Sequence, residues 1–253
     1  MAEVPNRTML RGLGMLELLS AHPEGLALCE MAEEMDLPRS TAFNLAHTLT
    51  ELDYAWYSED TGKYFLGLKM FEVGSSAINR IDIMKVIRGA MAGIHRQVNE
   101  TMHLGIASDR DMIYVDKLES TRSIRMSSYV GSRAPLYCTA LGKAVLASMR
   151  DEQVARLYRS VPLEAFTPHT ITTMPGLLKQ LESIRRQGYA VEREEYNESV
   201  CCVSVALRNG EARALYALSV SAPVFRMGES EIGQYSDLLL KAQQHIERFL
   251  RDR

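Results

Sequence analysis

Three amphipathic segments and a short hairpin fill the first 66 residues, and this order constrains the fold more than any other feature of the chain. Apolar residues recur every three or four positions in each segment, which is typical of helices with one buried face. These positions are Met9, Leu13, Leu16 and Leu19, then Leu28, Met31, Ala32 and Met35, then Ala42, Leu45, Leu49 and Leu52. Asp36-Leu37-Pro38 separates the second segment from the third. Proline cannot continue a helix but suits the first turn of the next one, so the pattern predicts a helix-turn-helix.

A hairpin follows the third helical segment. Tyr54-Ala55-Trp56-Tyr57-Ser58 and Tyr64-Phe65-Leu66 are β-prone runs on either side of a turn that contains Gly62. Such a pattern predicts two paired strands, and at this place they would form the wing of a winged helix-turn-helix. Lys63, beside the turn, then either contacts a phosphate or remains a solvated surface lysine, and the sequence leaves both open.

Polar groups on the outward face of the third segment suit the major groove of DNA. Their side chains can donate to phosphates and to base edges. We predict DNA contacts for Arg7, Arg39, Ser40, Thr41, Asn44, His47, Thr48 and Lys63.

The net charge of residues 1–65 argues against DNA binding. Residues 1–65 contain four Lys and Arg against eleven Asp and Glu, a net of −7, whereas the remaining residues carry a net of +4. A DNA-binding domain is expected to be basic. The stretch from 38 to 50 has no acidic residue, however. We therefore keep the DNA prediction and expect its affinity to rest on few phosphate contacts plus dimerisation.

Length and composition are those of an ordinary globular protein of one or two domains. The chain has 253 residues, and no apolar run approaches the length of a membrane span. The first residues lack the basic start and apolar core of a signal peptide. The four cysteines, at positions 29, 138, 201 and 202, have no metal-ligand spacing. We expect a cytoplasmic protein with reduced thiols, no metal site, no cofactor and no membrane partner.

The pattern after the wing predicts a second domain. Residues 69–80 read as a linker helix, and helices are also predicted at 82–99, 139–149, 151–160, 176–187 and 229–253. Strands are predicted at 102–108, 112–118, 124–127, 189–196, 200–207 and 214–221, with a loop at 131–135 and a hairpin turn at Asn209-Gly210. The fold class is α+β, a sheet of about six strands with helices beside it. No nucleotide-binding glycine motif occurs, so this domain suits a small-molecule sensor.

Four sequence blocks, in this order, resemble the IclR family of bacterial transcriptional regulators over nearly the whole chain. They are residues 37–41 with the wing at 61–67, residues 131–144, residues 188–195 with Cys202, and residues 217–223. The resemblance implies a winged helix-turn-helix at 1–67, a linker helix at 68–81, and a GAF-like effector-binding and oligomerisation domain at 82–253.

The resemblance also implies that a small organic or aromatic acid-like metabolite binds between the sheet and its helices. The matching positions are Ala140, Leu141, Glu192, Val200, Cys202, Ser219 and Ser221. Ser219 and Ser221 share one face of a strand, and a helix N-terminus near 139–142 offers N–H groups to an anion. At Glu192 many members of the family carry Asp. Aromatic acids and short keto acids both remain compatible with these residues.

Three function classes remain on the sequence alone. The first is a ligand-responsive repressor or activator that binds a double-stranded operator as a dimer or a dimer of dimers. The second is an enzyme for a small acyl compound with Cys202 as nucleophile. The third is a structural assembly protein. Glu194-Glu195 does not suggest paired catalytic carboxylates, because neighbours on a predicted strand point to opposite faces.

Overall fold

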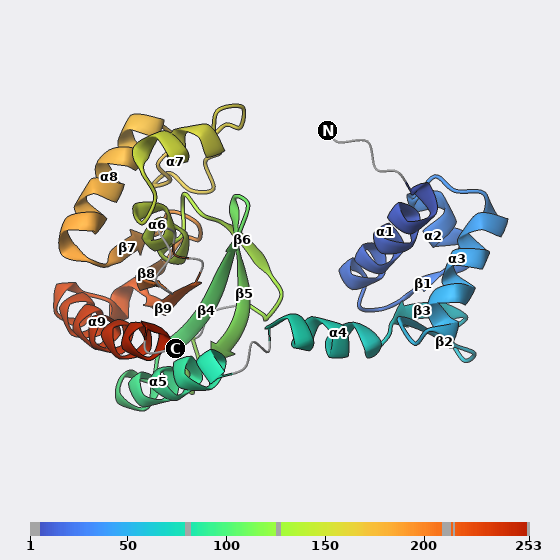
Figure 1. Cartoon of the computed structure of the whole chain (residues 1–253), viewed down its shortest axis with the longest axis horizontal. Coiled ribbons are helices and arrows are strands. Elements are labelled where there is room, and N and C mark those ends of the chain that lie inside the picture. The colour runs from blue at the N-terminus through green and yellow to red at the C-terminus, as the bar shows by residue number, and fades with distance from the viewer. Residues whose placement is uncertain (1–5, 79–81, 125–127, 209–213, 215, 252–253) are drawn as a thin grey trace. The chain divides into compact units, whose positions relative to one another are not determined.

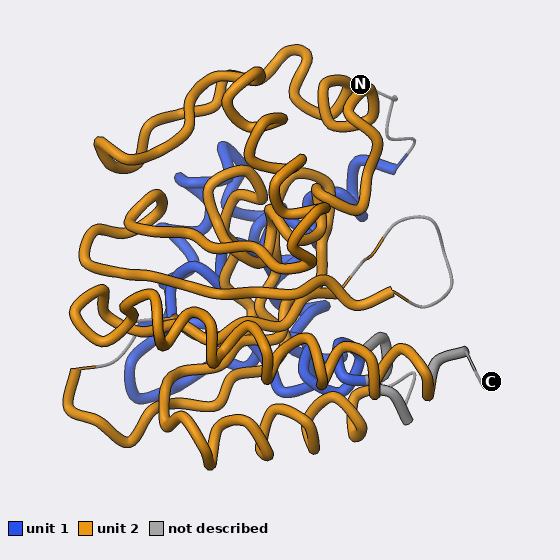
Figure 2. The backbone as a smooth tube through the Cα atoms, turned by 90° about the vertical axis from the view of Figure 1, so that its left-hand side faces the viewer, with its two compact units in different colours: residues 1–81 blue, residues 82–253 orange. Residues whose placement is uncertain are grey.

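The computed structural model describes residues 6–78, 82–124, 128–208, 214 and 216–251, without the side chains of 76–78, 82, 83, 250 and 251. The chain divides into two compact units, residues 1–81 and residues 82–253 (Figure 2). The first has a three-stranded sheet beside its helices and the second a six-stranded sheet between helices. The predicted α+β fold class is therefore confirmed.

The N-terminal unit is a winged helix-turn-helix. Its elements are α1 (Arg7–Ala21), β1 (Leu26–Ala27), α2 (Leu28–Glu34), α3 (Arg39–Glu51), β2 (Ala55–Ser58), β3 (Lys63–Leu66) and α4 (Lys69–Ile78) (Figure 1). Strands β2 and β3 form the predicted wing, and Gly62 takes φ +68° in its turn. The two-residue strand β1, which the sequence pattern did not predict, pairs with β3 and gives an antiparallel sheet of order β1-β3-β2.

The core of this unit lies between α1, α2 and α3. Met15 and Leu19 of α1 pack with Met31 of α2 and with Ala42 and Ala46 of α3. The two alanines remove side-chain bulk from the buried face of α3 and allow the helices to approach closely. The polar face of α3 is left exposed as a result.

Part of the predicted apolar face is not buried. Met9 and Leu13 are 66% and 56% exposed, because the elements packed on α1 bury only its second half. Leu52 follows the end of α3 and is 56% exposed. The spacing therefore predicted the helices correctly but was wrong about the burial of these three side chains.

The C-terminal unit is a sheet with helices on both faces. Its elements are α5 (Asp82–Val98), β4 (Thr101–Ser108), β5 (Asp111–Leu118), β6 (Arg133–Pro135), α6 (Ala140–Ala147), α7 (Asp151–Leu157), α8 (Met174–Gln187), β7 (Ala190–Arg193), β8 (Val200–Leu207), β9 (Tyr216–Pro223), η1 (Val224–Arg226) and α9 (Glu229–Arg251). All neighbouring strands pair antiparallel, in the order β6-β5-β4-β9-β8-β7.

Helices α5 and α9 cover one face of this sheet, and α6 and α8 lie on the other (Figure 1). Cys201, Val203 and Val205 of β8 point into the α5–α9 core. Because side chains alternate along a strand, Cys202 and Ser204 point to the α6 face. One end of that face is polar, and the candidate site lies there.

Several predicted boundaries are wrong, for local reasons. Residues 133–135 form β6 rather than loop, and this edge strand of the sheet tolerates Pro135, which has no N–H to donate. The strand predicted at 189–196 ends at Arg193, because Glu194 turns the chain with φ +57°. Strand β9 is shifted to Tyr216–Pro223. Ile124 lies in a bend, and residues 125–127 and Asn209-Gly210 fall outside the described residues.

Gly142 determines how closely α6 approaches the preceding loop. A Cβ at Gly142 would lie 2.2 Å from both the Cα and the carbonyl oxygen of Leu136. Contacts that short with backbone atoms cannot be relieved by turning a side chain. The N-terminus of α6 is therefore held in place by a position that only glycine fills.

We expect Gly142→Ala to lower the free energy of unfolding of the C-terminal unit by about 3 kcal/mol, as overpacked cores do. Urea unfolding followed by circular dichroism measures this. Gly233→Ala is the matched control, since Gly233 is exposed on α9 and a methyl group added there would have no neighbour within 4 Å. The control should stabilise the unit by up to about 1 kcal/mol through helix propensity. Equal stability of both variants would contradict the packing argument.

Candidate functional site

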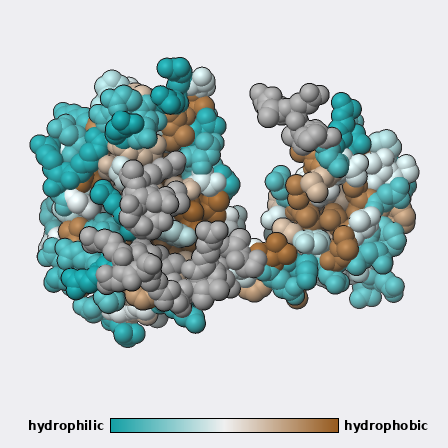
Figure 3. All heavy atoms as spheres, in the orientation of Figure 1, coloured by the Kyte–Doolittle hydropathy of each residue, from teal (hydrophilic) through white to brown (hydrophobic). Residues whose placement is uncertain are grey.

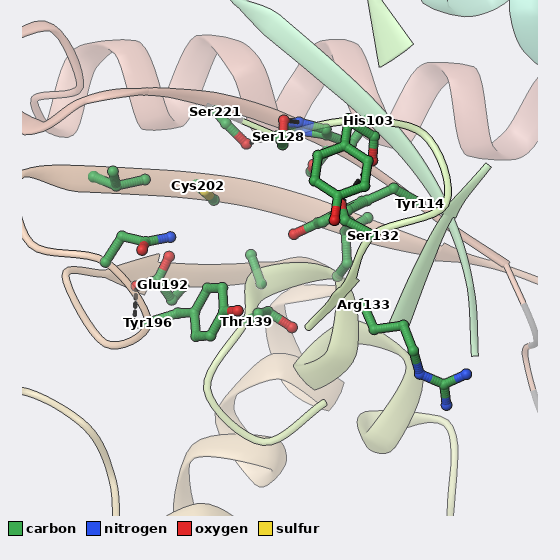
Figure 4. Close-up of a pocket in the computed structure, with 16 residues that line it drawn as sticks. His103, Tyr114, Ser128, Ser132, Arg133, Thr139, Glu192, Tyr196, Cys202 and Ser221 are labelled. Carbon is green, nitrogen blue, oxygen red and sulfur yellow. Dashed lines mark hydrogen bonds between the residues drawn. The ribbon is translucent and has the colours of Figure 1, made fainter. Parts of the chain in front are cut away.

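A cavity of about 300 Å³ lies between the polar end of the sheet and the N-terminus of α6 (Figure 4). It is lined by His103, Tyr114, Ser128, Tyr129, Ser132, Arg133, Thr139, Ala140, Leu141, Glu192, Tyr196, Asn197, Val200, Cys202, Ser219 and Ser221. All seven predicted effector-binding positions are therefore brought to one cavity, although they come from four separate elements.

Strand register explains how distant residues meet at this cavity. Glu192 on β7 lies opposite Cys202 on β8, and Cys202 lies opposite Ser221 on β9. Ser219, two residues before Ser221 on β9, lies opposite His103 on β4. Cross-strand neighbours share a face, so these side chains form two rows on the α6 side of the sheet.

The N-terminus of α6 supplies a positive end to the cavity. Thr139 is the N-cap, and its hydroxyl accepts from the Gly142 N–H at 3.2 Å while donating to the Pro135 carbonyl at 2.8 Å. The N–H groups of Ala140 and Leu141 precede the first intrahelical bond of the helix. Together with the helix dipole they favour an anion.

Glu192 supplies a protonatable carboxyl group. It is 2% exposed, and its Oε1 accepts the backbone N–H groups of Glu195 at 2.5 Å and Tyr196 at 3.3 Å. Burial raises the pKa of Glu192 to about 7, against the lowering effect of those two hydrogen bonds. Near neutral pH this carboxyl group can therefore act as a hydrogen-bond donor or as an acceptor.

A buried ion pair holds the turn that carries Tyr196. Lys143 of α6 pairs with Glu195, and burial lowers the pKa of Lys143 against the opposing effect of Glu195. The hydroxyl groups of Thr167 and Thr170 donate to the carbonyl oxygens of Glu194 and Glu195 at 2.5 and 2.6 Å. The carboxylate of Glu195 balances the positive charge of Lys143 inside the protein.

The two acidic neighbours at 194 and 195 are not on a strand, which corrects the sequence-based argument. They lie in the turn after β7, and the Glu194 carboxylate accepts the Ser199 N–H at 2.9 Å. Glu195 faces Lys143 instead. They do not form a pair of catalytic carboxylates, but the reason is the turn and not strand alternation.

His103 and Arg133 add no free positive charge to the cavity. The His103 ring lies 2.7 Å from the Ser128 hydroxyl and 3.4 Å from the Ser221 hydroxyl. Burial, with a smaller effect of Lys117, lowers its pKa to about 3, so the ring is neutral. Arg133 donates to Asp111 at 3.1 Å, and Figure 4 shows its guanidinium group directed away from the other labelled side chains.

The exposed face of α3 carries most of the predicted DNA contacts. Arg39, Ser40, Asn44, His47 and Thr48 are all exposed there, and Thr41 is half-buried. The Thr48 hydroxyl donates to the Asn44 carbonyl at 2.8 Å. The other two predicted contacts lie on different elements: Arg7 begins α1, and the Lys63 ammonium donates to the Gly25 carbonyl at 3.1 Å.

Family models match both units. Residues 8–57 match the IclR helix-turn-helix domain, and residues 75–248 match the domain described as bacterial transcriptional regulator IclR C-terminal. The chain belongs to the IclR family. It is a DNA-binding transcriptional regulator of the ligand-responsive IclR type and not an enzyme.

Individual IclR relatives agree with this assignment. The transcriptional regulator XynR of Escherichia coli K12 is 31% identical over 95% of both chains. The crystal structure of IclR from Thermotoga maritima has a TM-score of 0.80, with 30% identity over 96% of this chain and 98% of that one. An IclR homologue from Microbacterium hydrocarbonoxydans, crystallised with 4-hydroxybenzoate, has a TM-score of 0.85 at 21% identity over 97% and 100% of the two chains.

The enzyme alternative with Cys202 as nucleophile is not supported. Burial raises the pKa of Cys202 well above the ordinary thiol value, and nearby Glu192 raises it further. A nucleophilic thiolate needs the opposite environment, with a base or positive charge beside it. In the described parts of the IclR-type chain there is also no group of three metal-ligating side chains, and no helix with the length and apolarity to cross a bilayer.

Sequence reasoning missed most of the polar lining of the cavity. The missed residues are His103, Tyr114, Ser128, Tyr129, Ser132, Arg133, Tyr196 and Asn197, and Thr139 was noted only as the start of a helix. Ser132 and Arg133 lie inside the IclR-like block at 131–144, and Tyr196 and Asn197 lie in the gap between Glu195 and Cys202 of another block. His103 and Tyr114 carry no comparable signal, since they reach the cavity only through the pairing of β4 with β9 and β5.

Glu192→Gln should stabilise this IclR-type domain progressively, relative to wild type, as the pH rises from 4.5 to 7. The pKa of Glu192 is raised from 4.5 to about 7, so its contribution to stability is complete below pH 4.5 and is lost as the pH rises through 7. The difference in unfolding free energy should change by about 1.4 kcal/mol per pH unit in that window. Urea unfolding at several pH values measures it. A difference independent of pH would refute the raised pKa.

Proposed function

We propose that this regulator senses a small organic acid, aromatic or short keto acid, in the cavity between α6 and the sheet. One observation carries the proposal: the cavity joins a helix N-terminus to a buried protonatable carboxyl and several hydroxyl groups, without an unpaired cation among the lining residues described above. The homologue crystallised with 4-hydroxybenzoate supports an acid of that size.

Each group that lines the cavity can make a different contact with the ligand. The N–H groups of Ala140 and Leu141 donate to the carboxylate of the ligand, since a helix N-terminus favours negative charge. Ser219 and Ser221 offer hydroxyl donors from one strand face. Val200 and Cys202 line the cavity with less polar surface. Glu192 donates in its protonated form, which a bound anion favours further.

Acid binding should therefore weaken as the pH rises above 7, by up to tenfold per pH unit, because the ligand then requires a proton on Glu192. Calorimetric titration of the intact chain with 4-hydroxybenzoate and with pyruvate at pH 6, 7 and 8 measures this. Ser219→Ala should weaken binding about tenfold, the value of one hydrogen bond to a charged group.

Ser236→Ala is the matched control for Ser219→Ala. Ser236 is equally buried but lies on α9, where its hydroxyl donates to the Gly233 carbonyl. An acid that binds without dependence on Ser219 would contradict the assignment of the cavity. An acid that binds but leaves affinity for DNA unchanged would contradict its regulatory role, which requires different affinities of the ligand for two states.

We propose that the face of α3 reads a double-stranded operator. Arg39, in the first turn of α3, is the cation best placed to meet a phosphate or a guanine. Ser40, Thr41, Asn44, His47 and Thr48 supply further donors, and Arg7 and Lys63 supply contacts from α1 and the wing. We place the protein in the cytoplasm with its DNA, without a cofactor.

Arg39→Ala should weaken binding to a duplex selected by the intact chain and reduce the slope of log K against log salt by about 0.9, if one phosphate contact is lost. Fluorescence anisotropy in a salt series measures both. Arg11→Ala, which removes an exposed cation from α1, should leave the slope unchanged. An unchanged slope and an unchanged site preference for Arg39→Ala would overturn its assignment.

We also propose self-association as a dimer or a dimer of dimers. Met9, Leu10 and Leu13 form an exposed apolar stripe on α1, and Figure 3 shows apolar side chains at the surface of this unit. Clustered exposed apolar side chains are a feature of protein–protein contact sites. Two copies would double the few phosphate contacts that this acidic unit offers.

A further inference from the structure

Phe43 is the one side chain on the exposed face of α3, within the described residues, that is both large and apolar. It is 47% exposed, whereas the contribution of α3 to the core comes from Ala42 and Ala46. Arg39 lies one turn before it and His47 one turn after it, so the three share one stripe of the helix. A hydrophobic ring in the middle of a polar face serves neither the core nor solubility.

The ring of Phe43 is held by its neighbour. Phe43 and His47 stack with ring centroids 5.9 Å apart and an interplanar angle of 11°. Stacking restricts both side chains, so Phe43 presents a fixed apolar edge beside Arg39, Ser40 and Asn44.

The major groove offers one apolar group on its floor, the 5-methyl group of thymine, and phenylalanine is one of the side chains that contact it. Recognition helices of this motif meet base edges with their N-terminal half, which here includes Phe43. With few cations in this unit, base contacts carry a larger share of recognition. We propose that Phe43 contacts the 5-methyl group of a thymine in each operator half-site, with its ring held by His47.

This inference rests on DNA recognition by α3 and is tested on the intact chain. A preferred site is first selected from random duplexes, and each thymine in it is then replaced by deoxyuridine, which removes only the methyl group. When deoxyuridine replaces one particular thymine of each half-site, the wild-type protein should bind the duplex about fourfold more weakly, the value of one buried methyl group. For Phe43→Ala, the same replacement should have no further effect, because the partner of the methyl group is already missing.

Leu52→Ala is the matched control. Leu52 is at least as exposed as Phe43 but follows the end of α3, so this variant should keep the full response to deoxyuridine. Thermal unfolding confirms that both variants fold. The inference is overturned, with DNA binding intact, if the affinity of wild type is unchanged by deoxyuridine at every position. It is also overturned if Phe43→Ala still loses fourfold in affinity when that thymine is replaced.

Two further outcomes also overturn it. If Phe43→Ala changes the oligomeric state in sedimentation and leaves the deoxyuridine response unchanged, Phe43 belongs to a contact between copies. If the wild-type chain selects no sequence at all, DNA recognition by α3 fails together with the inference, which distinguishes that result from the loss of the thymine contact alone.

Discussion

The register between β8 and β9 is the constraint on which the cavity beside α6 depends. It sets Cys202 opposite Ser221 and Ser204 opposite Ser219, and the neighbouring pairs extend these rows to Glu192 and His103. A slip of β8 by one residue would turn Cys202 and Ser204 into the α5–α9 core. The apolar run Cys201, Val203, Val205 and Leu207 prevents that slip, because it must stay buried on the other face.

Helix α6 closes the cavity because Gly142 and Thr139 bring its N-terminus down onto the loop at Leu136. The same helix buries Lys143, whose charge is balanced by Glu195. Among the described residues that line it, the cavity therefore offers oriented dipoles and hydroxyl groups rather than a free cation. Dipoles and a protonatable carboxyl are well suited to a reversible sensor, since they bind a small acid without the strong attraction of a buried unpaired charge.

The N-terminal unit is acidic, whereas most DNA-binding domains are basic, and the structure shows where its acidic residues lie relative to α3. Within α3 the acidic residue is its last, Glu51, so the face with Arg39, Asn44 and His47 is free of negative charge. An acidic unit of this kind gains little from non-specific attraction to phosphates. The proposed contacts with base edges and the proposed assembly of two copies would then be the main sources of affinity.

The sequence by itself determined the elements whose signal is local. Periodicity placed α1, α2 and α3, the turn at Gly62 placed the wing, and the family blocks indicated the seven positions that prove to line one cavity. Only the tertiary structure decided what depends on partners far along the chain. His103 and Tyr114 enter the cavity through strand pairing, and β1 and β6 exist only because β3 and β5 offer edges. Periodicity shows that a helix has an apolar face but not how far its neighbours extend along it, and for that reason Met9 and Leu13 remain exposed.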